Sequence, residues 1–161
     1  MSFDHAGVPL RDAVLAALAD GGHELYDAGA FEDYPFAALA IGRALADGAT
    51  ERAVLVCGSG AGVSVAACKL PGVRAATVHD TYTAHQCVEH DDVRVLCLGA
   101  RVIGPELARE LVRTFLAARF TAEERHLRRL AQVDAIESDE LRPDDAPAPA
   151  PAAGAGGDAA R

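Results

Sequence analysis

The sequence predicts an α/β protein: a doubly wound, mostly parallel, five-stranded Rossmann-like sheet with helices on both faces. Short apolar runs alternate with segments of helical periodicity along most of the chain. Residues 52–57 form a continuous apolar run, which is typical of a strand buried on both faces. This run leads into a glycine-rich turn and then a helical segment, as in the repeating units of parallel sheets. Ligands of such sheets bind outside the carboxyl ends of the strands.

Local signals define the elements of the first third of the chain. Only residues 1–3 precede the polar segment Asp4-His5-Ala6-Gly7, so we expect either that the sheet begins with a stub of a strand or that the true start lies a few residues earlier. Residues 8–20 show helical periodicity and stop at a diglycine, and residues 23–28 are expected to form a short strand. A proline in the first turn is typical of a helix start, which predicts a helix over residues 34–48.

The rest of the chain continues this alternation. After the strand at residues 52–57, we predict helix 63–69, strand 72–78, helix 81–89, strand 93–98, helix 104–115 and a last amphipathic helix, 122–141, that closes the domain. Residues 89–92 are expected to form a loop before the 93–98 strand. Residues 143–161 contain no aliphatic residue larger than alanine. We therefore predict one folded domain over residues 1–142 and a disordered Pro/Ala/Gly-rich tail over residues 143–161.

The composition argues against several classes of function. The 161 residues carry a formal net charge of −9, which disfavours binding to nucleic acid or to an anionic membrane surface. No apolar stretch reaches the roughly 18 to 20 residues of a membrane span, and the first residues do not resemble a signal peptide. The four cysteines show no Cys-x-x-Cys spacing, and no His-x-x-x-His pair occurs. We therefore expect a cytoplasmic protein with free thiols, no metal and no cofactor.

The turn Gly58-Ser59-Gly60-Ala61-Gly62 predicts an anion site. Three glycines in five residues at a strand–helix junction let several backbone N–H groups converge, and a helix amino terminus adds partial positive charge. A plain tight turn is the simpler alternative. A dinucleotide fingerprint is another, because Asp80 lies about 20 residues further on, although Val63 stands where that motif needs its third glycine.

Cys57 is the last residue of the strand before this turn. A thiol among backbone donors at a helix amino terminus ionises more readily and can serve as a base or a nucleophile. A cysteine that ends an apolar strand is otherwise a small buried filler. The cysteines that lie within helix or strand patterns keep that second interpretation: Cys68, Cys87 and Cys97.

Two histidines beside acids are candidate proton carriers near neutral pH. His5 follows Asp4 at the end of the first strand, and His90 lies between Glu89 and Asp91. A solvated histidine is the alternative at both positions, since histidine has intermediate burial in ordinary folds.

Arg125 and Arg129 are a candidate phosphate site. They lie at i and i+4, so both occupy one face of the last predicted helix, and two guanidinium groups at this spacing suit a phosphate. The alternative is a solvated helix face on which these arginines pair with neighbouring acids.

These features occur together in an order found in one known family. The chain resembles the ribose-5-phosphate isomerase B and galactose-6-phosphate isomerase family of sugar-phosphate isomerases over nearly all of residues 1–140. The matching stretches are residues 4–7, 33–35, 56–64, 66–67, 72–76, 82, 89–90, 95–104 and 125–126. So many ordered matches are far more specific than any single motif.

The resemblance implies a metal-free aldose–ketose isomerase that works through a cis-enediolate. By this resemblance Cys57 is the base that moves a proton between C2 and C1, and Ser59 takes the place of a hydroxyl residue that assists the oxygen protons. His90 would open the furanose ring, Asp4 would contact the sugar, and the backbone of the glycine-rich turn would stabilise the enediolate. The positions implied on the phosphate and substrate side are His5, Asp91, Arg101, Arg125 and Arg129.

The resemblance also implies a homodimer or homotetramer with sites at the dimer interface, and ribose 5-phosphate as the first expected substrate. Two departures leave the substrate open: Asp91 stands where the family usually has asparagine, and Cys68 replaces a common asparagine. The alternatives are a four-carbon sugar phosphate, a hexose 6-phosphate, or a non-catalytic phosphosugar-binding homologue.

Overall fold

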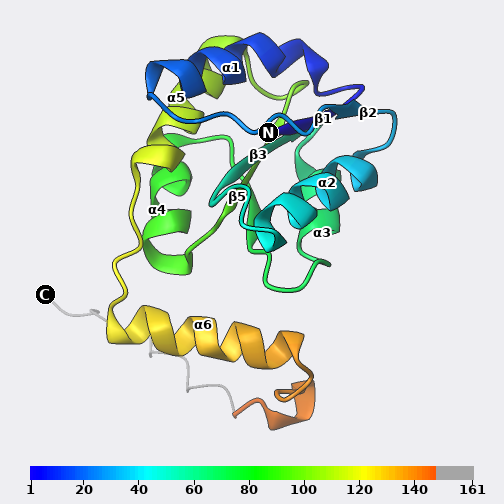
Figure 1. The fold of residues 1–161 in the computed structure, drawn as a ribbon. Coiled ribbons are helices and arrows are strands. Elements are labelled where there is room, and N and C mark those ends of the chain that lie inside the picture. The colour runs from blue at the N-terminus through cyan, green and yellow to red at the C-terminus, as the bar shows by residue number, and fades with distance from the viewer. Residues whose placement is uncertain (148–161) are drawn as a thin grey trace, which may run out of the picture.

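The computed structural model describes residues 1–147, and it confirms the predicted fold class (Figure 1). All five strands of its sheet are parallel, in the order β2-β1-β3-β5-β4. The strands are β1 (Ser2–Asp4), β2 (Ala30–Phe31), β3 (Ala53–Cys57), β4 (Ala75–Thr77) and β5 (Val95–Gly99). The helices are α1 (Arg11–Asp20), α2 (Tyr34–Ala46), α3 (Ala61–Ala67), α4 (Thr81–Asp91), α5 (Pro105–Ala117) and α6 (Glu124–Glu137).

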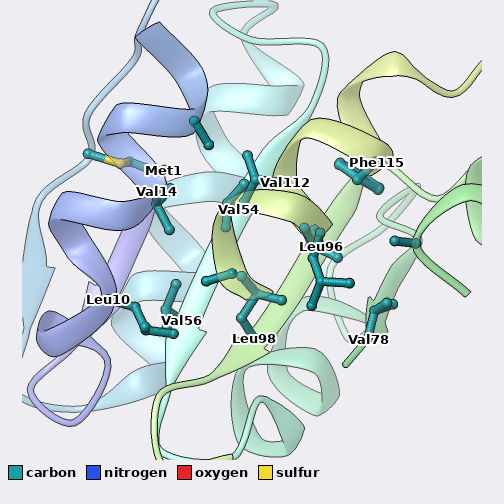
Figure 2. Packing of buried hydrophobic residues seen from close by; sticks show 14 of the residues in the cluster. Met1, Leu10, Val14, Val54, Val56, Val78, Leu96, Leu98, Val112 and Phe115 are labelled. Atoms are coloured by element: carbon teal, nitrogen blue, oxygen red, sulfur yellow. The ribbon is translucent and has the colours of Figure 1, made fainter. Parts of the chain in front are cut away.

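Helices cover both faces of the sheet because its central strands are apolar on both sides. Alternate residues of β3 point to opposite faces: Val54 and Val56 pack with α1, α4 and α5, whereas Leu55 and Cys57 pack with α2 and α3. Figure 2 shows the first of these two cores. Each fully buried side chain of this size stabilises the fold by roughly 1.5 to 3 kcal/mol. The carboxyl end of β3 is therefore held in place by packing on both faces.

The strand order creates a topological switch point between β1 and β3. From β1 the chain passes to one side to form β2, and it then returns to the other side of β1 to form β3. Connections that diverge in this way leave a crevice at the carboxyl ends of the two strands. Asp4 is the last residue of β1 and Cys57 the last residue of β3. The fold therefore places these two predicted site residues at the same crevice.

The strand predicted at residues 23–28 is wrong. That segment is irregular and exposed, and β2 is the two-residue strand Ala30–Phe31. The Ala28 N–H donates to the Met1 carbonyl and the Phe3 N–H donates to the Gly29 carbonyl. The Met1 amino group also donates to the Tyr26 carbonyl, but only the two residues of β2 form a ladder with the three-residue β1, so residues 23–28 are not part of a strand.

Most helix boundaries differ from the prediction by a few residues, including one end each of α1 and α4. The helix expected from residue 8 begins at Arg11, after a 3-10 turn over Val8–Leu10 that contains a proline. The loop expected at residues 89–92 is wrong for most of its length, because α4 continues through His90 to Asp91. The helix ends where Asp92 adopts a left-handed conformation with a φ of +46°.

α6 is amphipathic as predicted, but it does not close the domain. Figure 1 shows it apart from the sheet, after an extended connection from α5. It contacts α4 and the loop before β4, where the Gly72 N–H donates to the Glu137 carboxylate at 2.9 Å. His126 is the buried residue of α6. Its apolar residues remain about half exposed within residues 1–147: Leu127, Val133 and Ile136.

The predicted disordered tail lies mostly outside the described residues. Of that segment, Pro143–Asp145 forms a 3-10 turn. In the part of the chain that the structure describes, no helix is both long enough and apolar enough to cross a membrane.

Candidate active site

A pocket of about 340 Å³ opens at the switch point, and we call it the thiol pocket. Its volume is within the range of about 300 to 1,000 Å³ that is usual for small-molecule sites. Residues from the ends of β1, β3 and β5 and from the start of α2 line it: Asp4, His5, Ala6, Tyr34, Cys57, Gly58, Ser59, Gly62, Arg101 and Val102. A larger cavity of about 630 Å³, next to Arg52 and Arg119, contains none of the predicted site residues.

Cys57 lies in the wall of the thiol pocket with 4% of its surface exposed. Its Sγ accepts a hydrogen bond from the Gly60 N–H at 3.1 Å. Gly99 pairs with Cys57 across the sheet, and a Cβ at Gly99 would lie 2.6 Å from the Ser59 carbonyl carbon. Only a glycine at the end of β5 therefore lets the turn after Cys57 fold back over the sheet.

The glycine-rich turn is tightly folded around this thiol. Gly60 has a φ of +81°, a left-handed conformation that glycine adopts without strain. The Ala61 N–H makes a long contact of 3.3 Å with Ser59 Oγ. The predicted anion-hole residues are Gly58, Gly60, Ala61 and Gly62. The amides of two of them are thus engaged within the turn, that of Gly60 strongly and that of Ala61 weakly. Gly58 and Gly62 line the pocket itself.

Tyr34 and Val102 line the pocket, and the sequence reasoning did not select either as a site residue. A Cβ at Gly62 would lie 3.2 to 3.3 Å from the Tyr34 ring, so this ring covers the first turn of α3 closely. In the sequence, the segment around Tyr34 indicates only the start of a helix and one of the stretches that match the family. Its position beside Gly62 depends on how α2 packs against α3, which no local pattern reveals.

Asp4 and His5 line the thiol pocket from the end of β1. Asp4 is buried, and its Oδ1 accepts the Gly7 N–H at 2.9 Å, which fixes the carboxylate. His5 is exposed, and its Nδ1 lies 2.7 Å from the Glu32 carbonyl oxygen. This hydrogen bond, with the nearby Glu32 and Asp4 carboxylates, raises the pKa of His5 above its usual value. Together with Arg101, His5 provides positive charge at the pocket mouth.

The other predicted residues form a second group together with His126, which is not among the predicted site residues. We call this group the histidine–arginine cluster: His90, Asp91, Arg125, His126 and Arg129. None of them lines the thiol pocket. α4 starts at the carboxyl edge of the sheet and runs back to the amino edge, where Asp92 pairs with Arg74 just before β4. At 1.5 Å per residue, ten residues of helix separate His90 from the carboxyl edge by about 15 Å.

The rings of His90 and His126 stack, with centroids 4.3 Å apart and an angle of 29° between their planes. Gln86 Nε2 lies 3.0 Å from His90 Nδ1, and Thr121 Oγ1 lies 2.9 Å from His126 Nδ1. His126 Nε2 is buried without a hydrogen-bond partner. Burial, with the neighbouring His90 and Arg125, lowers the pKa of His126. The pair is therefore held in a fixed geometry, with His126 favouring the neutral form.

The arginines of this cluster are exposed on α6. Arg125 donates to the Glu123 carboxylate at 2.9 Å, so part of the solvated-face alternative applies to it. Arg129 makes no salt bridge within residues 1–147. Asp91 is exposed beside His90 at the end of α4. All these groups can therefore meet a ligand or a second molecule.

The remaining cysteines differ from Cys57 in their surroundings. All four are free thiols, as predicted. Cys87 and Cys97 are buried away from the pocket, and burial raises the pKa of Cys87 to about 11 and that of Cys97 further. Cys68 is exposed, and its Sγ donates to the Ala75 carbonyl. Among the cysteines, Cys57 is thus the one that combines a pocket with a backbone donor.

Asp80, the acid of the dinucleotide alternative, has a structural role. Its Oδ1 accepts the Thr83 N–H at 2.7 Å and caps the first turn of α4. Within residues 1–147, no group of three or more histidine, cysteine, aspartate or glutamate side chains is arranged to hold a metal ion.

Comparisons with known proteins agree with this geometry. A family model described as Ribose/Galactose Isomerase matches residues 1–133. The chain belongs to this family. The ribose-5-phosphate isomerase B of Escherichia coli is 37% identical over 138 residues, which cover 83% of this chain and 92% of that protein. The type B ribose 5-phosphate isomerase of Trypanosoma cruzi superposes with a TM-score of 0.82 at 36% identity, covering 87% of this chain and 95% of that chain.

Family members act on more than one sugar phosphate. The D-erythrulose-4-phosphate isomerase of Pectobacterium atrosepticum is 38% identical over 122 residues, which cover 73% of this chain and 80% of that protein. Membership of the ribose/galactose isomerase family makes this chain a sugar-phosphate isomerase and confirms the predicted enzyme class.

Proposed function

We propose that this isomerase interconverts ribose 5-phosphate and ribulose 5-phosphate through a cis-enediolate, with Cys57 as the base. The observation that carries this proposal is the position of the Cys57 thiol, which lies in the wall of a pocket at the switch point and accepts the Gly60 amide hydrogen bond at 3.1 Å. An amide that donates to sulfur favours the thiolate, which is the form able to remove a proton from carbon.

The reaction begins with the ring form of the sugar. As the furanose opens, His90 gives a proton to the ring oxygen and takes the proton of the C1 hydroxyl, so that C1 becomes a carbonyl. The Cys57 thiolate then removes the proton from C2. The carbonyl oxygen at C1 becomes an enediolate oxygen, the C2 hydroxyl proton passes between the oxygens with the help of Ser59, and the thiol returns its proton to C1. Those backbone donors of residues 58–62 that are not engaged within the turn stabilise the negative oxygen, each by about 3 to 4 kcal/mol.

Charge at the pocket mouth suits the phosphate group. The Glu32 carbonyl and the neighbouring carboxylates raise the pKa of His5, and Arg101 is exposed beside it without a salt bridge to any residue of the range 1–147. In this proposal Asp4 orients a sugar hydroxyl. Asp91 contacts the substrate beside His90.

The histidine–arginine cluster reaches the substrate from a second copy of the chain. One copy has Cys57 at the carboxyl edge of the sheet and His90 at the amino edge, about 15 Å back along α4. A homodimer that places the α6 of one protomer over the thiol pocket of the other would join the two groups. Such a dimer would also cover the exposed apolar residues Leu127, Val133 and Ile136.

A four-carbon sugar phosphate is the second candidate substrate, because a relative named D-erythrulose-4-phosphate isomerase is as similar to this chain as the named ribose-5-phosphate isomerase B. A panel of ribose 5-phosphate, D-erythrulose 4-phosphate and a hexose 6-phosphate, assayed with a chelator present, decides between them. The highest kcat/KM for ribose 5-phosphate supports the proposal, and a preference for either of the others refutes the substrate assignment. Solvent deuterium should enter at C1 or C2, and its absence would refute the enediolate.

A further inference from the structure

Thr77 contacts the glycine-rich turn from outside the thiol pocket. It ends β4, the edge strand, which β5 separates from β3 in the sheet. Its Oγ1 donates to the Gly60 carbonyl at 2.9 Å. Its Cγ2 lies close to the α-carbon of the same glycine, because a Cβ at Gly60 would be 2.9 Å from it. Thr77 thus reaches over the end of β5 to hold a residue that follows β3.

Gly60 connects this threonine to the thiol. Its N–H donates to Cys57 Sγ at 3.1 Å, while its carbonyl accepts from the Thr77 hydroxyl at 2.9 Å and from the Ser64 N–H of α3 at 3.2 Å. Gly60 is buried and has a left-handed backbone. The backbone of residues 97–98 in β5 lies so close that a Cβ at Gly60 would come within 3.3 Å of it. Gly60 is therefore held between β5 and Thr77. The Thr77 hydroxyl makes the shorter of the two hydrogen bonds to the Gly60 carbonyl, and together with the Ser64 N–H it fixes the direction of that carbonyl and the conformation that points the Gly60 amide at sulfur.

We propose that Thr77 is a positioning residue of the isomerase, which sets how strongly the Gly60 amide stabilises the Cys57 thiolate. The inference rests on the proposed role of Cys57 as the base. Thr77 acts through Gly60, because its one hydroxyl proton is already given to the Gly60 carbonyl and the residue does not line the pocket. A hydroxyl in this position also polarises the Gly60–Ala61 peptide, which strengthens the next amide of the turn as a donor.

Two substitutions separate the hydroxyl from the shape of the side chain. Thr77→Val keeps the branched shape and removes the hydroxyl donor, so the Gly60 carbonyl keeps only the Ser64 N–H among the donors within residues 1–147. Thr77→Ser keeps the hydroxyl and removes the methyl group. Thr114→Val, on α5 and away from the pocket, is the matched control for the same chemical change.

The readout is the alkylation of Cys57 by iodoacetamide without substrate, followed by peptide mass spectrometry, because the thiolate is the reactive form. Thr77→Val should slow alkylation of Cys57 at pH 7 by about three- to tenfold, the worth of one hydrogen bond, and move its pH profile to higher pH. Thr77→Ser and Thr114→Val should stay within about twofold of the wild type. The exposed Cys68 in the same digest reports any general change in reactivity.

In the isomerase assay, Thr77→Val should lower kcat by the same factor and leave KM nearly unchanged. A wild-type rate of Cys57 alkylation in folded Thr77→Val overturns the inference. So does a Thr77→Ser protein that is as slow as Thr77→Val, because packing of the methyl group would then explain the effect. Because alkylation needs no sugar, a shifted alkylation profile in a protein that isomerises no sugar phosphate would support the role of Thr77 and refute the proposed function.

Discussion

A mixture of two inactive variants should recover activity if each site is built from two chains. In Cys57→Ser the base is lost, and in His90→Asn the group that opens the ring is lost. A hybrid dimer of the two has one site with both substitutions and one site with neither. Random exchange of equal amounts makes half of the dimers hybrids, so about a quarter of the wild-type number of sites should be intact.

The recovery of about a quarter of the sites is expected because one chain places Cys57 and His90 at opposite edges of the sheet. His90 lies about 15 Å from the carboxyl edge along α4, whereas a proton carrier has to come within about 3 Å of its target. If a single chain supplied both residues, every site in the mixture would carry one substitution, and no activity would return. The assay is ribulose 5-phosphate formation after co-denaturation and refolding, with hybrid formation checked by native mass spectrometry. Hybrids without activity would refute the shared site.

Three further predictions concern single groups. Cys57→Ser should lower kcat by about 10² to 10⁴, the usual worth of a general base, while Cys68→Ser, exposed and outside the pocket, should leave steady-state kinetics unchanged. Because the pKa of His5 is raised above its usual value, its cationic form persists to higher pH than that of a free histidine side chain. KM for the sugar phosphate should therefore rise as the pH increases further, and a His5→Asn protein, measured over the same range, should show no such rise. Arg52 donates to the Phe115, Leu116 and Ala118 carbonyls at the end of α5, so Arg52→Met should lower the free energy of unfolding in urea by about 2 kcal/mol. Equal stability of Arg52→Met and the wild type would contradict that assignment.

The sequence was sufficient where local signals and buried structure agree. The continuous apolar run at 52–57 predicted β3, and the glycines after it predicted the turn, because a strand buried on both faces and a left-handed turn leave clear signatures. Asp4 and Cys57 came to one pocket because the ends of neighbouring parallel strands meet at one edge.

The errors arose where an element depends on distant partners. Residues 23–28 have a strand-like composition, but β1 is too short to pair with them. Residues 89–91 are polar, so they suggested a loop, yet the buried Cys87 and Val88 before them anchor the helix that continues through them. Tyr34 lies at the site because α2 packs against α3, which the sequence does not reveal. The periodicity of α6 predicted its apolar face correctly but not that this face is left uncovered by the rest of the described chain.

The position of the arginines on α6 couples association to substrate binding. The helix that exposes Leu127, Val133 and Ile136 also carries Arg125 and Arg129, so burying its apolar face against a second copy would deliver both cations to that copy. A ligand that contacts both protomers binds the dimer more tightly than the monomer. By thermodynamic linkage, the free energy that dimerisation adds to ligand binding equals the free energy that the ligand adds to dimerisation. Sedimentation of dilute protein should therefore show more dimer with ribulose 5-phosphate than without it. Arg129→Met should abolish this increase, because Arg129 would contact only the ligand. A dimer fraction independent of the sugar phosphate would show that the phosphate is held within one chain.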